Sequence, residues 1–360
     1  RFPEFEGEWE EKQLGNIIKV NSGKDYKHLD KGDIPVYGTG GYMTSVSEPL
    51  SEIDAVGIGR KGTINKPYLL EAPFWTVDTL FYCTPKKETD ILFILSLFRK
   101  INWKVYDEST GVPSLSKQTI NKINRFVPTN KEQQKIGKFF SKLDRQIELE
   151  EQKLELLQQQ KKGYMQKIFS QELRFKDENG NDYPDWTNER LGEVTTVTMG
   201  QSPKSVNYTD NSNDTVLIQG NADIENGLIN PRIYTREVTK LIQKDEIILT
   251  VRAPVGKLAM AQINACIGRG VCSIKGDKFL YYFLEWFATQ NKWIRFSQGS
   301  TFESISGNDI RNIHIKIPVE DERTKIIKLL NSLDVLNSKT DLKIQNLKQR
   351  KQSLLQKIFV

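Results

Sequence analysis

The sequence has few of the residues on which most catalytic and metal sites depend. Its 360 residues include only two histidines, His28 and His314, and three cysteines, Cys83, Cys266 and Cys272. An odd cysteine count without a CxxC pair argues against a disulfide scaffold or a zinc ribbon and is typical of a reducing, cytoplasmic compartment. So few histidines leave little basis for acid–base or metal chemistry.

The motifs of common enzyme classes are also missing. The sequence has no GxxxxGK[ST] phosphate loop, no HExxH, no GxSxG and no Asn-Pro-Pro-Tyr type motif of an amino-methyltransferase. The longest apolar run, residues 91–98, is far shorter than the ~20 residues of a membrane span. We therefore expect a non-catalytic chain without a membrane segment, a metal or a cofactor of its own.

What the chain has in excess is positive charge. Lysine and arginine number 52 against 46 acidic residues, which gives a net charge of +6 and a pI near 8.9. This surplus favours an acidic partner such as nucleic acid. The length is sufficient for two domains of ordinary size.

One module occurs twice in the chain. Its opening residues recur at a constant offset of 177: Trp9 with Trp186, Leu14-Gly15 with Leu191-Gly192, and Gly23 with Gly200. Its later residues recur at an offset of 190: Leu115 with Ile305, Ile120 with Ile310, Pro128 with Pro318, Lys135-Ile136 with Lys325-Ile326, Leu143-Asp144 with Leu333-Asp334, and 166–169 with 356–359. The second copy therefore carries a net insertion of 13 residues, 190 minus 177.

The middles of the two copies are much less alike than their ends. The first copy reads IPVYGTGG over 34–41 and GIGRKG over 57–62, whereas the second reads VLIQGN over 216–221 and LTVRAPVG over 249–256. Two like scaffolds with unlike centres predict two like devices with different targets. Drift after an old duplication is the alternative.

Each copy is predicted to end in a long helix, over residues 129–172 and 318–360. Apolar residues recur there with a period of 3.5 between charged flanks, which is typical of a coiled-coil seam. The predicted seam residues are Ile136, Phe140, Leu143, Ile147, Leu154, Leu157, Tyr164 and Ile168 in the first helix, and Ile326, Leu330, Leu333, Ile344, Leu347, Leu354 and Ile358 in the second. Lys161 and Lys351 interrupt the seam at equivalent positions, where polar residues commonly fix register. Two amphipathic helices packed on their own domains are the alternative.

The two helices are predicted to pair antiparallel, because the first leads into the second half of the chain and the second returns from it. About 33 helical residues span roughly 50 Å, which corresponds to about 15 base pairs of duplex DNA. Such a pair would act as a ruler.

The parts that precede the helices, residues 1–128 and 173–317, are called the first and second heads. Each is predicted to combine short strands with one late helix. Predicted strands are 55–58, 79–83, 246–251 and 270–274, and the predicted late helices are 90–103 and 277–296. The many aromatic residues of the second late helix are expected to be core, and Cys83 and Cys272 to be buried apolar residues.

Glycine-rich loops of both heads carry polar and basic residues suited to DNA. Glycine lets the backbone approach a phosphate, Arg, Asn and Gln read base edges, and Lys holds phosphates. The candidates in the first head are Lys24, Tyr26, Lys27, Tyr37, Thr39, Tyr42, Arg60, Lys61, Lys66 and Thr110. Those in the second head are Gln201, Ser202, Lys204, Gln219, Asn221, Arg252, Lys257, Arg269, Ser300 and Thr301. At each single position a solvated loop residue is the alternative.

These residues together resemble the specificity subunit of type I restriction-modification systems over essentially the whole chain. The motifs that carry the resemblance are Arg1-Phe-Pro-Glu-Phe with Trp9, Arg174-Phe with Trp186, GIGRKG at 57–62 with PFWTVDTL at 73–80, IQGN at 218–221 with VRAP at 251–254, the helix openings after Pro128 and Pro318, and the helix ends Gln-Lys-Ile-Phe.

The resemblance implies a mixed α/β fold with a pseudo-twofold internal repeat. Two α+β target-recognition domains, at 1–128 and 173–317, would be joined by a pair of long antiparallel coiled-coil helices. It also implies double-stranded DNA as ligand, and two methyltransferase subunits that hold S-adenosylmethionine. Motor-nuclease subunits would join through that complex. A coiled-coil adaptor that binds protein, or a stand-alone DNA-modifying enzyme with an unrecognised site, is the alternative function.

Overall fold

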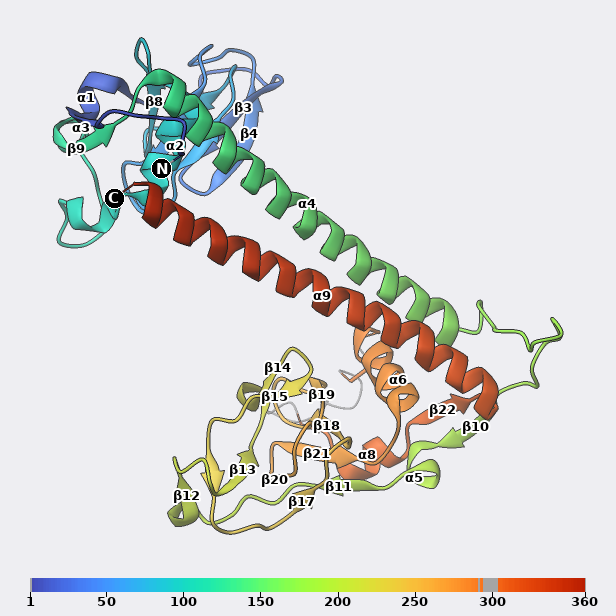
Figure 1. Cartoon of the computed structure of the whole chain (residues 1–360). Coiled ribbons are helices and arrows are strands. Elements are labelled where there is room, and N and C mark those ends of the chain that lie inside the picture. Colours follow the sequence, from blue (N-terminus) through green and yellow to red (C-terminus); the bar gives the residue numbers. More distant parts are fainter. Residues whose placement is uncertain (1, 291, 294–303, 360) are drawn as a thin grey trace. The chain divides into compact units, whose positions relative to one another are not determined.

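The computed structural model describes residues 2–290, 292–293 and 304–359. The chain forms two compact units: unit 1 comprises Arg1–Lys153 with Thr340–Val360, and unit 2 comprises Leu154–Lys339. Two long helices, α4 (Asn130–Phe169) and α9 (Glu320–Ile358), each contribute one part to each unit (Figure 1). Each unit therefore contains one head and a segment of both helices.

The head of unit 1 is built on a four-stranded antiparallel sheet in the order β2-β8-β5-β6. Its strands are β2 (Ile18–Ser22), β8 (Leu80–Pro85), β5 (Ala55–Gly59) and β6 (Tyr68–Leu70). Every residue of β5 is buried, as expected of a strand covered on both faces. A smaller sheet in the order β4-β3-β7 and a two-stranded sheet β1-β9 flank it. These consist of β4 (Gly41–Val46), β3 (Ile34–Gly38), β7 (Trp75–Thr76), β1 (Glu10–Gln13) and β9 (Asn124–Val127).

The helices of this head are short, and both long helices complete its core. They are α1 (Leu14–Ile17), α2 (Ile91–Lys100), the 3-10 turn η1 (Trp103–Tyr106) and α3 (Lys117–Lys122). Helix α2 begins after Asp90, whose carboxylate accepts a hydrogen bond of 2.8 Å from the Phe93 amide, which is a typical N-cap. Its apolar face packs with Ile136 and Phe140 of α4 and with Phe359 after α9.

The head of unit 2 has larger sheets. The first, with β11 (Val197–Met199), β21 (Val271–Ile274), β18 (Ile247–Thr250), β19 (Leu258–Met260), β15 (Leu228–Ile229) and β14 (Ile224–Glu225), has six strands in that order. The second has five, in the order β12 (Tyr208–Thr209), β16 (Tyr234–Thr235), β13 (Thr215–Ile218), β20 (Ala265–Ile267) and β17 (Leu241–Ile242). A two-stranded sheet pairs β10 (Thr187–Arg190) with β22 (His314–Ile317).

The helices of unit 2 repeat the arrangement of unit 1. They are α5 (Leu191–Val194), α6 (Lys278–Thr289) and α8 (Gly307–Arg311), with the 3-10 turns η2 (Ser205–Asn207) and η3 (Asn221–Asp223). The aromatic residues of α6 lie mainly in the core, as expected from their spacing: Phe279, Tyr282, Phe283 and Phe287 are buried, whereas Tyr281 and Trp286 are half-buried. Residues Ile326 and Leu330 of α9 and Ile168 of α4 complete this core.

The fold confirms the internal repeat. In both units a short helix follows the first strand. The strand order β2-β8-β5 of the first head corresponds to β11-β21-β18 of the second. The second sheet of each head contains one parallel pair of strands, β3 with β7 in the first head and β13 with β20 in the second. Cys83 and Cys272 lie on the corresponding strands β8 and β21, two register positions apart, and both are fully buried, as expected. Burial raises the pKa of the Cys272 thiol to about 12. The mixed α/β class with two α+β heads is therefore confirmed.

The long helices run antiparallel within each unit. In unit 1 Lys351 in the last quarter of α9 meets Asp144 in the first half of α4, and in unit 2 Lys161 in the last quarter of α4 meets Asp334 in the first half of α9. The predicted seam residues are mostly buried, but Leu154, Leu157, Tyr164, Leu354 and Ile358 are only half-buried. Towards the helix ends their neighbours Met165 and Leu355 are buried instead.

Several element ends differ from the expectation. Helix α2 ends at Lys100 and not at 103, because the chain turns into η1 there, and α6 ends at Thr289. The further predicted residues 291 and 294–296 lie outside the described residues. Strand β8 extends two residues beyond the expected end at 83. Within the described ranges no helix combines the length and hydropathy needed to cross a membrane.

Candidate nucleic-acid interface

Six of the candidates in the first head surround strand β7. The Lys24 amide donates to the Thr76 carbonyl at 2.8 Å, and the Trp75 indole donates to the Lys24 carbonyl at 2.9 Å. The Val77 amide donates to the Tyr37 carbonyl at 3.0 Å. These bonds hold the segments of Lys24, Tyr26, Lys27, Tyr37, Thr39 and Tyr42 on one small sheet, while Lys24, Lys27 and Tyr42 remain exposed.

A glycine makes this close approach possible. An ideal Cβ added to Gly23 would lie 2.0 Å from the Val77 carbonyl oxygen, so only glycine fits here. Its repeat counterpart, Gly200, would meet the Gly268 carbonyl oxygen at 2.1 Å. The two heads therefore use the same device to bring a basic or polar loop against the following hairpin.

The remaining candidates of the first head lie on two adjoining loops. The Arg60 amide donates to the Thr79 carbonyl at 2.8 Å, and the Leu115 amide donates to the Arg60 carbonyl at 2.9 Å. Lys61 pairs through its backbone with Ser114, which places it beside the loop of Thr110. Arg60, Lys61 and Thr110 are exposed and lie together, and Lys66, also exposed, follows on the same loop.

Backbone hydrogen bonds hold the Thr110 loop in shape. The Asp107 carboxylate accepts from the Ser114 and Ser109 amides at 2.9 and 3.0 Å. These bonds lower the pKa of Asp107, because they stabilise its ionised form. The loop is thus preorganised by hydrogen bonds of its own residues.

The second head gathers a more polar set around the β20–β21 turn. The Arg269 amide donates to the Ser202 hydroxyl at 3.0 Å, and the Gln201 amide donates to the Ile267 carbonyl at 2.9 Å. An ideal Cβ on Gly268 would touch both the Ser202 hydroxyl and the Gln219 side chain. The structure therefore brings Gln201, Ser202, Gln219 and Arg269 together, with the Gln201 and Arg269 side chains exposed.

Asp223 fixes the adjoining turn and was not among the expected site residues. Its carboxylate accepts from the amides of Gln219 at 2.8 Å and of Gly220 at 3.1 Å. Asn221 follows on η3 and is half-buried. An aspartate three residues after the glycine of a turn is the sequence signal that could have found it.

The remaining candidates of the second head do not form one group. The Lys257 ammonium donates to the carbonyls of Ile224 at 2.5 Å and of Asn221 at 3.2 Å, and these hydrogen bonds stabilise the turn that contains Asn221. Arg252 is exposed and pairs through its backbone with Ser304, whereas the exposed Lys204 lies near Glu237. Ser300 and Thr301 lie outside the described residues.

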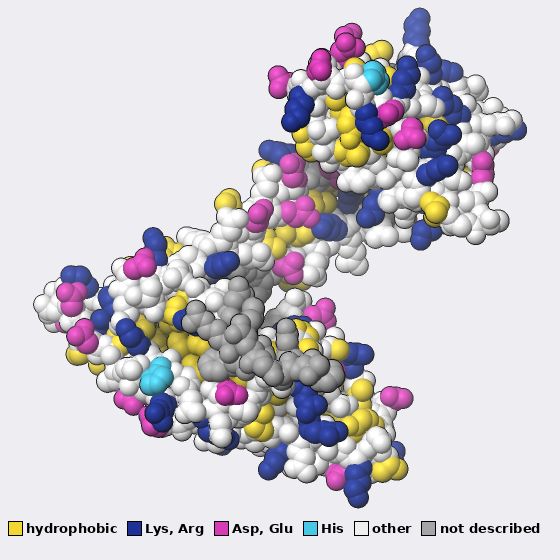
Figure 2. Space-filling view, turned by 180° about the vertical axis from the view of Figure 1, so that it is seen from behind, with side chains coloured by type: hydrophobic (Ala, Val, Ile, Leu, Met, Phe, Trp, Pro, Cys, Tyr) yellow, Lys and Arg dark blue, Asp and Glu magenta, His cyan; other side chains and the backbone are white. Residues whose placement is uncertain are grey.

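The surface of the first head is rich in positive charge. Figure 2 shows Lys and Arg side chains gathered on one side of this head, which is the upper body in that view. In the part of the chain that the structure describes, no group of three or more His, Cys, Asp or Glu residues could hold a metal ion. Both loop surfaces expose hydrogen-bonding groups and positive charge, which suit the phosphates and base edges of nucleic acid.

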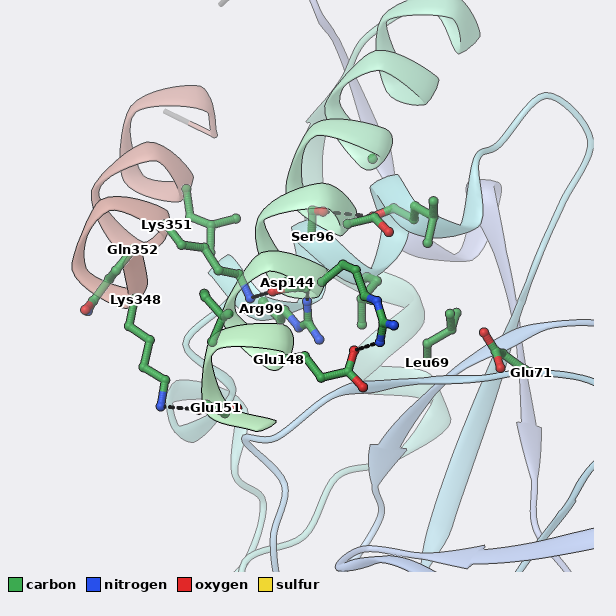
Figure 3. Close-up of a pocket in the computed structure, with 17 residues that line it drawn as sticks. Leu69, Glu71, Ser96, Arg99, Asp144, Glu148, Glu151, Lys348, Lys351 and Gln352 are labelled. Atoms are coloured by element: carbon green, nitrogen blue, oxygen red, sulfur yellow. Dashed lines mark hydrogen bonds and ion pairs between the residues drawn. The ribbon is translucent and has the colours of Figure 1, made fainter. Parts of the chain in front are cut away.

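Beneath the first head, a groove of about 980 Å³ in unit 1 has an ionic floor (Figure 3). The Asp144 carboxylate of α4 pairs with both Arg99 of α2 and Lys351 of α9. The rim pairs Arg145 with Glu148. Burial and the neighbouring Arg99 lower the pKa of Lys351, although Asp144 opposes that shift.

Unit 2 has a related cluster with the opposite excess charge. The Lys161 ammonium contacts Glu285 of α6 at 2.7 Å and Asp334 of α9 at 2.7 Å. The Tyr282 hydroxyl donates to Asp334 at 2.7 Å. Burial raises the pKa of Glu285, although Lys161 opposes that shift. Lys161 and Lys351 were expected at the seam, but their partners from the heads were not.

The sequence matches the family model for the type I restriction modification DNA specificity domain over residues 6–159 and 183–349. A protein of Methanocaldococcus jannaschii, provisionally named type I restriction enzyme MjaX specificity subunit, is 30% identical over 261 residues, which cover 68% of this chain and 61% of that protein. The type I restriction enzyme MjaVIII specificity subunit of the same organism is 25% identical over 312 residues, covering 79% and 71%. The chain thus spans about three-fifths of the length of the first relative.

Two solved structures share the fold. The crystal structure of the type I restriction-modification system S subunit from M. genitalium has a TM-score of 0.70 at 16% identity, covering 98% of this chain and 96% of that one. A chain from a structural study of complex assembly and conformational transition of the type I R-M system has a TM-score of 0.60 at 20% identity, covering 98% and 97%. At these identities the likeness concerns the fold.

Proposed function

The chain belongs to the type I restriction modification DNA specificity family, and on this premise we propose that it is the sequence-specific DNA-recognition subunit of such a complex. Its two heads would each read one half of a bipartite site in double-stranded DNA. The observation that carries this proposal is the contrast between the repeated scaffold and the unlike loop surfaces. In the first head these loops expose Lys24, Lys27, Arg60 and Lys61, whereas in the second they expose Gln201, Lys204, Arg252 and Arg269.

The chemistry of the two surfaces supports different half-sites. Lysine mainly neutralises phosphates, whereas arginine and glutamine make paired hydrogen bonds to guanine and adenine edges. Hydrogen bonds to neighbouring strands and turns hold both surfaces, which favours recognition because less order has to be gained on binding. We infer that the target bases differ between the two heads.

The helix pair would set the gap between the half-sites. About 33 paired helical residues correspond to roughly 50 Å and to about 15 base pairs. The charged and exposed faces of α4 and α9 would also carry two methyltransferase subunits. S-adenosylmethionine would be held by those subunits, and motor-nuclease subunits would join through them in the cytoplasm.

The chain itself would perform no chemistry. Two histidines, three buried cysteines and the lack of enzyme motifs support this part of the proposal. It is tested by incubating the purified chain with DNA and S-adenosylmethionine, with and without a methyltransferase partner. Methyl transfer by the chain alone would contradict the proposal, and transfer only by the complex would support it.

DNA recognition is tested by binding at increasing salt and by a methylation map of a genome that encodes the complex. Specific binding should weaken steeply with salt, because phosphate contacts release counterions. The map should show two short half-sites with a fixed gap. Replacing residues 1–128 by another first head should change one half-site only, and a change in both would refute independent reading.

A further inference from the structure

The same pair of helix residues meets the head in both units. Socket 1 consists of Asp144 and Lys351, and socket 2 consists of Asp334 and Lys161. In each socket the aspartate comes from the first half of one long helix and the lysine from the last quarter of the other. The two aspartates, like the two lysines, are 190 residues apart, so the sockets are repeat counterparts.

The head residue that enters each socket has the opposite charge. Arg99 on α2 binds the aspartate of socket 1, whereas the two carboxylate oxygens of Glu285 on α6 lie 3.0 and 2.7 Å from the lysine nitrogen of socket 2. These residues follow the N-caps Asp90 and Asp277 by nine (99 − 90) and eight (285 − 277) positions, so they stand at adjacent places on equivalent helices. Figure 3 shows Arg99 and Lys351 meeting at Asp144.

We propose that the paired aspartate and lysine form a charge-ambivalent docking socket, which holds a head helix bearing either a cation or an anion at this place. The aspartate accepts from a cation, and the lysine donates to an anion. One helix pair can therefore carry heads of either kind. The proposal goes beyond DNA recognition and does not rest on the proposed function, because it concerns how a head is fixed to the helices.

These contacts matter for the stability of the fold because the side chains that make them are largely shielded from solvent. The side chains of Lys161 and Lys351 are 11% and 16% exposed, and those of Asp144 and Arg99 are 29% and 27% exposed. In such half-buried sites an ion left without a partner is costly. Unit 2 also shows that one lysine can serve two carboxylates, since Lys161 contacts both Glu285 and Asp334.

The two sockets differ in one hydrogen bond to the aspartate, and this difference determines how much protection each variant is expected to lose. The Tyr282 hydroxyl donates to the socket aspartate in unit 2, whereas Leu95 stands at the corresponding position of α2, five residues after its N-cap. A glutamate placed at position 99 would lack this extra donor. We therefore expect a small loss for Arg99→Glu, and a larger loss once the socket lysine is removed.

The first experiment compares Arg99→Glu in the presence and absence of Lys351, with hydrogen exchange of the α2 amides in the full chain as readout. R99E should lower protection by no more than about 3-fold, since the introduced carboxylate pairs with Lys351. In a K351M background the same change should lower protection by about 10-fold or more, because two carboxylates then face each other without a cation. An equal loss in both backgrounds would overturn the proposal.

A matched control and the second socket complete the test. Arg145→Glu, a charge reversal on the exposed rim of the same groove, should cost the same in the native and the K351M backgrounds. In unit 2, Glu285→Arg should keep the α6 amides protected while Asp334 is present and lose protection by about 10-fold in a D334N background. Protection that does not depend on Asp334 would contradict the socket, even if the K351M variant fails to fold.

Discussion

The carboxylate of Glu322 binds Arg174 in a bidentate manner, with both oxygens 2.8 Å from guanidinium nitrogens. Glu322 also accepts from the Trp186 indole at 2.9 Å and from the Phe175 amide at 3.2 Å, and it is fully buried. One side chain at the start of α9 thus fixes both the segment that enters the second head and the tryptophan that opens the second copy of the repeat.

Glu322→Gln is expected to destabilise the second head strongly. The substitution removes the charge that the Arg174 guanidinium needs, and breaking a buried pair on one side typically costs about 3 kcal/mol. Urea denaturation of the full chain measures the loss. Glu320→Gln, two residues earlier and 81% exposed, is the matched control and should change stability by less than about 0.5 kcal/mol. Similar losses for both variants would show that the bidentate pair is unimportant.

The pH dependence of unit 2 should carry the signature of Glu285. Burial is the main cause that raises the pKa of Glu285 in the folded chain. The protonated group therefore stabilises the folded chain fully below its ordinary pKa of 4.5, and this stabilisation is lost as the pH rises through the pKa of the folded state. Glu285→Gln should therefore gain melting temperature relative to the native chain as pH is raised from about 4 to about 7.5. A difference that falls with pH would contradict this interpretation.

Asp107 provides a comparison of opposite sign. Its pKa is lowered, chiefly by the Ser114 amide, so its contribution to stability is present above its ordinary pKa of 3.8 and is lost as pH falls through the folded value. Asp107→Asn should accordingly cost stability at neutral pH and less at acidic pH. Melting curves of D107N and the native chain at about pH 3 and about pH 7 check the sign.

Gly270→Ala should disrupt the loop surface of the second head. An ideal Cβ at this position would lie 1.9 Å from the Gln219 carbonyl oxygen, and relieving such overpacking costs roughly 1–3 kcal/mol. Gly220→Ala is the control, since nothing lies within 4 Å of its Cβ position and its φ of 174° is extended backbone. Thermal unfolding should separate the two variants, and equal stability would refute the steric argument.

Substitutions on the loop surfaces should affect DNA recognition in two distinct ways. Arg269→Ala should weaken specific binding by roughly 10- to 100-fold and relax only the second half-site, as expected for a lost base contact of ~1–3 kcal/mol. Lys66→Ala should weaken all sequences alike and reduce the salt slope by about one. Binding of the assembled complex to site variants at several salt concentrations distinguishes these results. A uniform effect of R269A would place it at a phosphate.

A heptad added to both helices should lengthen the gap of the recognised site. Insertion between residues 153 and 154 of α4 and between 339 and 340 of α9 keeps the seam in register and adds about 10 Å, or about three base pairs. A methylation map reads the new gap directly. A heptad in α4 alone is the control, because the contacts of Lys161 with Asp334 and of Asp144 with Lys351 can then no longer form together, and it should abolish assembly. An unchanged gap after the double insertion would show that the helices set no distance.

Features that depend on one segment at a time could be predicted from the sequence. The repeat, both long helices and the buried aromatic residues of α6 follow from periodicity and offset, since each pattern lies within one stretch of chain. The partners of Lys161 and Lys351 could not be predicted, because Glu285 and Arg99 come from head helices whose angle of approach depends on the tertiary core. Lys257 shows the same limit: the sequence placed it on a candidate loop but did not indicate that its ammonium donates to the carbonyls of Asn221 and Ile224.

The division of the chain into units has a consequence for biosynthesis. Unit 2 is one uninterrupted stretch, Leu154–Lys339, whereas the core of unit 1 needs Leu355 and Phe359 as well as residues made much earlier. During synthesis the first head therefore emerges first but lacks two apolar side chains of its core until residue 359 has been added. The second head, although translated later, has all its parts available sooner. The residues of the second core are therefore complete in the growing chain before those of the first, which is the reverse of the order of the two heads in the sequence.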